Sequence, residues 1–312
     1  MAVVMLVMPN VIPVFYVHVL VESLCLSILA MSFNFLFGYM GMLSFGQAAF
    51  YGVGAYTVSM LLTKTEVPFG VSIIAGIVLT AAIGAIVGAF CVRMRGIYFG
   101  LLTMGFGQLL YVLCMRAYSF TGGDDGIQGV FPPAAVHGPH AYYYLVLAIF
   151  AAAAVIYWYI VHSPFGHTMK SIRENSLRMQ FLGINLYKYY LIAFIIAAAF
   201  AGLGGALWAP FNRSVHPSMM DWSVSGQAVI MGILGGPLSF WGPMLGAFIF
   251  TFIHAFVTGF TTYWMWILGL ILLLVVLFLP GGIIPSIRRA VLARQQNKAT
   301  MRLKEGSGSG TS

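Results

Sequence analysis

The chain has 312 residues, of which 61% are apolar and only 7% charged, and its formal net charge is +8. This composition excludes a soluble domain and indicates an integral membrane protein. The positive charge does not indicate nucleic acid binding, because twelve of the fifteen lysines and arginines gather in three short segments.

The charge-free runs predict the membrane spans. A helix that crosses ~30 Å of hydrocarbon needs about 20 residues, and the runs lack the alternation of a membrane β-barrel. We therefore expect an all-α polytopic membrane protein with about eight transmembrane helices, nine at most, some of them broken. In chain order they are Val14–Phe37, Leu43–Leu62, Phe69–Val92, Gly96–Met115, Ala141–Val161, Tyr189–Phe211, Ser223–Gly235, Phe240–Gly259 and Trp264–Leu279.

Glycine indicates where these helices break and where they pack closely. Gly46-Gln47-Ala48 recurs 180 residues later as Gly226-Gln227-Ala228. In transporters, glycine-interrupted segments at corresponding positions of two halves mark broken helices around the substrate path, so Gly46 and Gly226 are predicted to be break positions. Small residues at four-residue spacing predict close helix contacts, as in Gly84/Gly88 and Ala198/Gly202/Ala206.

Uncharged polar groups near the breaks are candidates for a substrate path. An amino acid zwitterion or an amide needs hydrogen-bond donors and acceptors, which side chains and exposed backbone supply. The alternative role for each is a hydrogen bond between helices. The candidates are Asn34, Ser44, Gly46, Gln47, Gln108, Ser225, Gly226 and Gln227.

The distribution of basic residues predicts the orientation. They gather in Arg93/Arg95, in Lys170–Lys188 and in the tail Arg288–Lys304, whereas the alternate loops hold only Lys64, Arg116 and Arg213. Basic loops face the cytoplasm in most membrane proteins, so we expect a cytoplasmic C-terminus. The outer loops then carry the acids Glu66, Asp124, Asp125 and Asp221, and six turn-forming residues make Thr121–Gly129 a loop.

One charged segment, Ser163–Lys188, lies between two apolar runs and holds five of the 22 charged side chains. Ile172, Asn175, Ser176, Met179 and Leu182 follow helical spacing and predict a helix over Lys170–Gly183. A helix of ~12 residues is marginal in water. Either a partner protein or the bilayer surface therefore supports it.

The energy source of transport is either ATP bound by another chain or an ion gradient coupled through this one. The chain contains no GxxxxGK[ST] loop and so does not hold ATP phosphates itself. Ion coupling needs ionisable groups inside the membrane, and Glu22 is the single acid within a span, one helical turn after His18. An ion-coupled secondary transporter that uses Glu22 is thus the alternative of a different class. The three cysteines have no metal-ligand spacing, and we predict neither a metal site nor catalytic residues.

Five blocks of sequence, between about residues 20 and 285, resemble the LivM-type permease subunit of branched-chain amino acid ABC importers. They are NFLFGYMGMLSFGQAAFYGVGAY (34–56), RGIYFGLLTMGFGQ (95–108), TGGDDGIQG (121–129), SPFGHTMKSIRENSLRMQFLGINLYKYYLIAFIIAAAFAGLGGALWA (163–209) and GGPLSFWGPMLGA (235–247). The chain departs from this pattern at Gln47, where many relatives have His, and at Met42, where Gln is common. Both departures affect substrate identity more than family membership.

The resemblance implies a permease domain over 14–287, with 163–188 as a cytoplasmic coupling loop. It is flanked by an N-terminal segment (1–13), a basic cytoplasmic tail (288–305) and an expression linker (306–312). The implied ATPase-coupling residues are Lys170, Arg173, Glu174, Asn175, Arg178 and Gly183, and the implied receptor-docking residues are Asp124, Asp125 and Asp221.

The resemblance also implies the partners: two ABC ATPase subunits, a second LivH-type permease and a periplasmic substrate-binding protein, in the bacterial inner membrane. ATP and Mg²⁺ would be bound and ATP hydrolysed on the ATPase chains, and this chain would bind no cofactor. The implied substrates are branched-chain or other hydrophobic amino acids, with amides, urea or small aromatic acids as alternatives.

Overall fold

The computed structural model describes residues 13–65, 67–133, 136 and 138–259, together with 266, 267, 269, 270, 273, 277 and 281–285. Several predicted segments lie outside the described residues. They are residues 1–12 of the N-terminal segment, Glu66, most of the span Trp264–Leu279, the basic tail and the linker.

The charge-free runs form helices, and the all-α fold is confirmed. Five of the helices (α2, α4, α5, α7 and α10) are long and apolar enough to cross a membrane. The long helices are α2 (Val14–Met40), α3 (Gln47–Lys64), α4 (Phe69–Cys91), α5 (Ile97–Arg116), α7 (Pro139–His162), α10 (Leu186–Asn212), α11 (Trp222–Gly235) and α12 (Gly242–Thr258).

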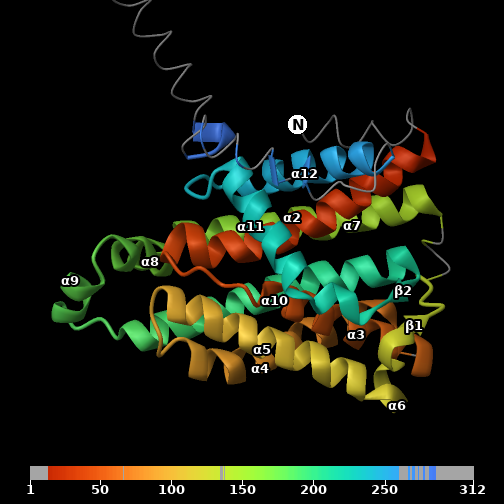
Figure 1. Cartoon of the computed structure of the whole chain (residues 1–312), viewed down its shortest axis with the longest axis horizontal. Helices are drawn as coiled ribbons and strands as arrows, with labels where there is room; N and C mark the ends of the chain where they lie inside the picture. Colours follow the sequence, from red (N-terminus) through yellow and green to blue (C-terminus); the bar gives the residue numbers. More distant parts are fainter. Residues whose placement is uncertain are drawn as a thin grey trace, which may run out of the picture.

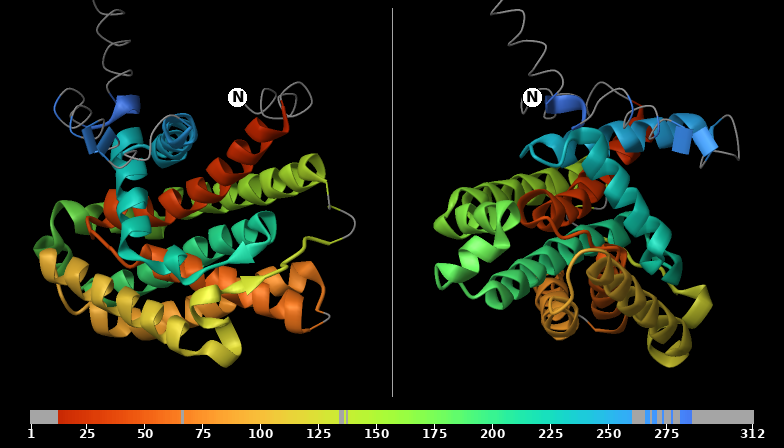
Figure 2. Two further views of the ribbon diagram at one scale, coloured as in Figure 1. Left: turned by 45° about the vertical axis from the view of Figure 1, so that its right-hand side comes forward. Right: turned by 60° about the vertical axis from the view of Figure 1, so that its left-hand side comes forward.

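Most of the long helices run side by side, which gives the molecule two ends (Figure 1). The short helices α8 (Pro164–Glu174) and α9 (Ser176–Phe181) lie at one end, here called the α8–α9 end. At the other, the hairpin end, β1 (Ile127–Gln128) pairs antiparallel with β2 (Ser214–Val215). Three short helices accompany them: α6 (Tyr118–Thr121), η2 (Gly123–Asp125) and η4 (Pro217–Met220). Two loops far apart in the sequence therefore form one structure. Figure 2 shows α11 steeply inclined to the long helices.

The centre of the bundle is α2. Nearly all of its residues from Val17 to Met40 are buried, and it contacts α7, α10 and α12. The outer helices instead expose apolar side chains, among them Ile74, Ile86 and Leu101. This arrangement suits a bilayer, where an apolar outer surface is stable and a polar outer surface is not.

The helices α3 and α10 cross in close contact. A Cβ atom built on Gly54 would lie 2.1 Å from the carbonyl oxygen of Gly202, and one built on Gly205 would lie 1.8 Å from that of Tyr51. The backbones are therefore in direct contact, as small residues allow in membranes. The predicted small-residue contacts are confirmed here and at α4, where a Cβ on Gly84 would lie 2.6 Å from that of Ala198.

Candidate functional site

A break inside the bundle separates α2 from α3. Gly41 ends α2 in the left-handed conformation, with φ of 75°, and the N–H groups of Gly41 and Met42 donate to the carbonyls of Phe37 and Leu36 (3.2 and 3.0 Å). This is a glycine-terminated helix end. The chain between 41 and 46 is not helical, and α3 begins at Gln47 with Gly46 as its N-cap. The predicted span Leu43–Leu62 therefore starts four residues later, and the predicted break at Gly46 is confirmed.

The broken segment is held by α5 and α11. The Phe45 N–H donates to the Thr103 hydroxyl (3.2 Å), and the Ala48 N–H donates to the Ser225 hydroxyl (3.0 Å). A Cβ on Gly46 would lie 2.6 Å from the Thr103 carbonyl oxygen, so only glycine fits this contact. Non-helical backbone at membrane depth is stable only where it is buried in protein or lines a cavity, and here Ser44 and Gly46 are buried while Gly41 is exposed.

Gln47 brings a free donor to this break. Its side-chain oxygen accepts a hydrogen bond from Ser32 (3.2 Å), and the side chain is 1% exposed. Among the described residues, its amide nitrogen has no hydrogen-bond partner. A buried donor without a partner is unfavourable by about 1–3 kcal/mol, and a ligand or a water molecule removes that penalty. Gln47, Ser44 and Ser225 thus gather where the path is predicted.

Among the described residues, the other side chains predicted for the path make no hydrogen bond to this group. Asn34 lies in α2 and donates from Nδ2 to the Tyr157 hydroxyl of α7 (3.2 Å), a hydrogen bond between helices. Gln108 and Gln227 are half-buried on α5 and α11. The predicted break at Gly226 is wrong, because α11 continues through it as a regular helix.

The charged segment forms two helices where one was predicted. Ser163 caps α8, its hydroxyl accepting the Gly166 N–H (3.3 Å). Asn175 interrupts the helix because its side-chain oxygen accepts the Arg178 N–H (2.9 Å) and so begins α9. Asparagine is a strong N-cap and a weak helix former. The predicted stop at Gly183 is confirmed, with φ of 82°.

The helix α8 is attached to the end of α2. Its Met169 and Ile172 are buried in the bundle core. The Arg173 guanidinium donates a hydrogen bond to the carbonyl of Gly38, and the Lys170 ammonium lies 5.3 Å from the centre of the Tyr39 ring. A cation beside the last carbonyls of a helix satisfies acceptors that have no partner within the helix. These contacts therefore link α8 to the turn that precedes the break.

The helix α9 has a different character, because Met179 packs against the bundle while most of its other apolar side chains are exposed. Leu177 is 61% exposed, Phe181 83% and Leu182 70%. Glu174 and Arg178 are exposed beside them. The resemblance assigns coupling to the charged residues, and the structure exposes this apolar surface beside them. The signal in the sequence is the presence of Leu177, Phe181 and Leu182 within a charged segment. Exposed apolar patches usually mark interaction sites.

The acids predicted for receptor docking lie at the hairpin end. Asp124 and Asp125 are exposed in η2. Asp221 is half-buried and caps α11, where its carboxylate accepts the Ser223 N–H (2.9 Å). The pairing of Ile127 with Val215 joins the loops that carry these acids.

Comparisons with known proteins identify the family. A family model described as the permease component of the branched-chain amino acid transport system matches residues 15–277. The high-affinity branched-chain amino acid transport system permease protein LivM of Escherichia coli K12 is 27% identical over 84% of this chain and 68% of its own length.

Two further relatives are also transport permeases. A probable branched-chain amino acid transport permease protein LivM of Methanocaldococcus jannaschii is 22% identical over 83% of this chain and 90% of its own length. The guanosine ABC transporter permease protein NupQ of Bacillus subtilis is 36% identical over 28% of this chain and 27% of its own length. No solved structure gives a significant match. Since the family model covers most of the chain, the protein belongs to the family of branched-chain amino acid transport permeases.

Proposed function

We propose that this permease subunit of an ABC importer forms the path for branched-chain or other hydrophobic amino acids across the bacterial inner membrane. Family membership and the printed functions of the LivM relatives support this. The observation that carries the proposal is the exposed apolar surface of α9, beside a helix α8 fixed to the bundle. The arrangement suits a subunit that is driven by a soluble partner.

The α8–α9 end faces the cytoplasm in this proposal. It holds the basic residues of the charged segment, and the turn with Arg93 and Arg95 lies close by, because Tyr187 at the start of α10 hydrogen-bonds to the Ala89 carbonyl near the end of α4 (3.2 Å). At the hairpin end, Lys64 donates to the carbonyls of Ser119 and Phe120 in α6. The excess of basic residues at the α8–α9 end favours a cytoplasmic location.

The partners follow from this orientation. Two ABC ATPase subunits bind ATP and Mg²⁺, and one of them docks on α9 through Leu177, Phe181 and Leu182, with Glu174 and Arg178 at the rim. A LivH-type permease completes the membrane part. The periplasmic receptor docks at the hairpin end, over Asp124 and Asp125. Substrate passes near the amide of Gln47, whose free N–H groups suit a carboxylate or a carbonyl oxygen.

Reconstitution tests the function. The chain, a LivH-type permease and both ATPases are placed in liposomes with the receptor outside, and uptake of labelled leucine is measured. The ATPases face the liposome interior, and we expect uptake only when ATP is enclosed there. An ATPase variant that binds but does not hydrolyse ATP should give no uptake. Uptake by this chain alone under a proton gradient would refute the proposal and favour the carrier that uses Glu22. Competition by unlabelled amides, urea and small aromatic acids tests the alternative substrates.

The contact of Arg173 with Gly38 gives a second test, of coupling. In the reconstituted importer, Arg173→Gln is expected to keep ATPase binding and hydrolysis while leucine uptake per ATP falls about tenfold, because a hydrogen bond to a charged group is lost between α8 and α2. Arg173→Lys should restore part of the uptake, since the ammonium also donates. Lys188→Gln removes an equivalent charge at the same end and should change nothing. Normal uptake per ATP in Arg173→Gln would contradict the coupling role.

A further inference from the structure

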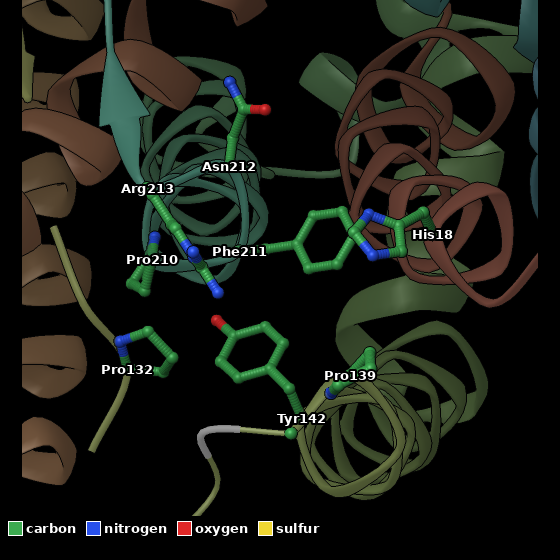
Figure 3. A pocket seen from close by; sticks show the side chains of 9 residues that line it. His18, Pro132, Pro139, Tyr142, Pro210, Phe211, Asn212 and Arg213 are labelled. Atoms are coloured by element: carbon green, nitrogen blue, oxygen red, sulfur yellow. The ribbon is translucent and has the colours of Figure 1, made fainter. Parts of the chain in front are cut away.

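A cavity of about 440 Å³ opens at the hairpin end, between the start of α2, the start of α7 and the end of α10 (Figure 3). Its lining includes His18, Tyr142, Phe211 and Arg213. We propose that this cavity is an outer binding site for a free hydrophobic amino acid, whose carboxylate is held by Arg213. The inference rests on the proposed function and adds a site that is separate from the break at Gln47.

Arg213 supplies an available positive charge. Its guanidinium lies 5.9 Å from the centre of the Phe131 ring, and within the described part of the chain it has no carboxylate partner. Figure 3 shows the side chain directed into the cavity, toward the Tyr142 hydroxyl. Arginine binds carboxylates through paired N–H groups. An amino acid carboxylate is therefore a fitting partner.

The backbone holds Arg213 in an unusual conformation. Among the described residues it is the only one other than glycine with a positive φ, of 57°. Its carbonyl accepts the N–H groups of Gly129 and Val130 (3.0 and 3.1 Å), which fixes it against the loop between β1 and α7. Glycine or asparagine usually takes this position after a helix. A strained residue that is held by its surroundings indicates a functional position. Glycine would adopt this φ without strain, so the arginine is present for its side chain.

The end of α10 complements the carboxylate site with acceptors. The last carbonyls of a helix have no partner within the helix and carry partial negative charge. Those of α10 lie beside Arg213, because Arg213 directly follows the helix. A zwitterion placed here has its carboxylate on the guanidinium and its ammonium group near these carbonyls.

The remaining walls suit an apolar side chain. The rings of Tyr142 and Phe211 stack with centres 5.9 Å apart and planes at 17°, and the His18 ring lies 5.0 Å from Phe211. Tyr142 donates its hydroxyl proton to the Leu207 carbonyl (2.6 Å), so this group is already satisfied. Prolines 132, 139 and 210 complete the wall. The volume lies within the range of about 300–1,000 Å³ that is typical of small-molecule sites.

This cavity lies far from the polar group at the break. Ser32, which donates to the Gln47 side chain, lies 14 residues after His18 in α2, and this separation corresponds to roughly 21 Å along a helix. The cavity is thus an outer vestibule, where substrate released by the receptor first meets the permease.

The test measures binding of labelled leucine to the purified full-length permease in lipid nanodiscs, without receptor, up to millimolar concentrations. We expect saturable binding that Arg213→Gln weakens about ten- to a hundredfold, the usual effect of losing a hydrogen bond to a charged group. Arg213→Gly removes the cation while relieving the positive φ, so it should lose binding without loss of thermal stability. Arg116→Gln, which changes an arginine at the end of α5 outside the cavity lining, should bind as the unmodified chain does.

Ligand chemistry provides the second arm. Leucinamide lacks the carboxylate and should not compete, whereas valine and isoleucine should. Unchanged leucine binding in both Arg213 variants, or equal competition by leucinamide, would overturn the inference. So would Arg213 variants that lose only affinity for the receptor, since an acidic receptor side chain would then be the partner. If the permease binds no leucine but the reconstituted importer takes it up with ATP, this inference fails and the proposed function stands.

Discussion

A permease with serine in place of both Leu177 and Phe181 is expected to fold normally and to lose its ATPase partners. The two side chains are 61% and 83% exposed and contribute little to the core. Buried apolar anchors at the centre of an interface contribute about 2 kcal/mol or more each. Removing two of them should weaken ATPase binding about a thousandfold. Co-purification of the ATPases and ATP-driven leucine uptake measure the loss.

The matched control for this variant is Gln180→Ser, which changes an exposed polar residue of the same short helix. It should keep both ATPase binding and uptake. The thermal midpoint of the isolated permease should be the same for both variants, which separates docking from folding. ATPases that co-purify with the Leu177→Ser/Phe181→Ser chain as well as with the unmodified one would show that the docking surface lies elsewhere.

Valine at Gly205 should prevent the bundle from assembling. Even a single methyl group at this position would lie 1.8 Å from the Tyr51 carbonyl oxygen, and the obstacle is backbone on both sides. Overpacking usually costs about 1–3 kcal/mol because side chains adjust, but here α3 and α10 must separate. Since α3 begins at the break, that separation also displaces Gln47. We expect little or no monodisperse protein by size-exclusion chromatography in detergent.

A glycine in open space provides the comparison. Gly70 lies in the first turn of α4, and no heavy atom would lie within 4 Å of its Cβ. Gly70→Val should give the yield and the elution profile of the unmodified chain. If Gly205→Val elutes at the same volume and melts at the same temperature as Gly70→Val, the close α3–α10 crossing is not needed for assembly.

Much of the helical framework follows from the sequence, because the bilayer imposes a length and excludes charge. The ends of α4, α5 and α7 fall within a few residues of the predicted spans. The break before Gln47 is also predictable, since Gly41 and Gly46 occupy positions where a helix end and a backbone contact require glycine. The break predicted at Gly226 was wrong because glycine is also an ordinary residue of membrane helices, where it allows close packing.

The contacts at the two ends of the bundle were not predictable from residue patterns. The resemblance implied that Arg173 contacts the ATPase, whereas its partner within this chain is a backbone carbonyl, which every residue has and no sequence pattern marks. Arg213 was interpreted only as an orientation charge, because its cavity is assembled from α2, α7 and α10. The split at Asn175 depends on one side-chain cap that outweighs the helical spacing around it.

The attachment of α8 has a consequence for how such permeases exchange parts during evolution. Arg173 contacts Gly38, and a Cβ on Gly38 would lie 2.1 Å from the carbonyl oxygen of Pro237, in the turn between α11 and α12. Three stretches of chain therefore meet at one glycine. A recombination event that replaced residues 163–185 alone would bring in a helix without its matching surface. The three segments that meet at Gly38 are far apart in the sequence. Substitutions near 38–41, 173 and 237 should therefore be acquired together when a permease adopts the ATPase of another importer.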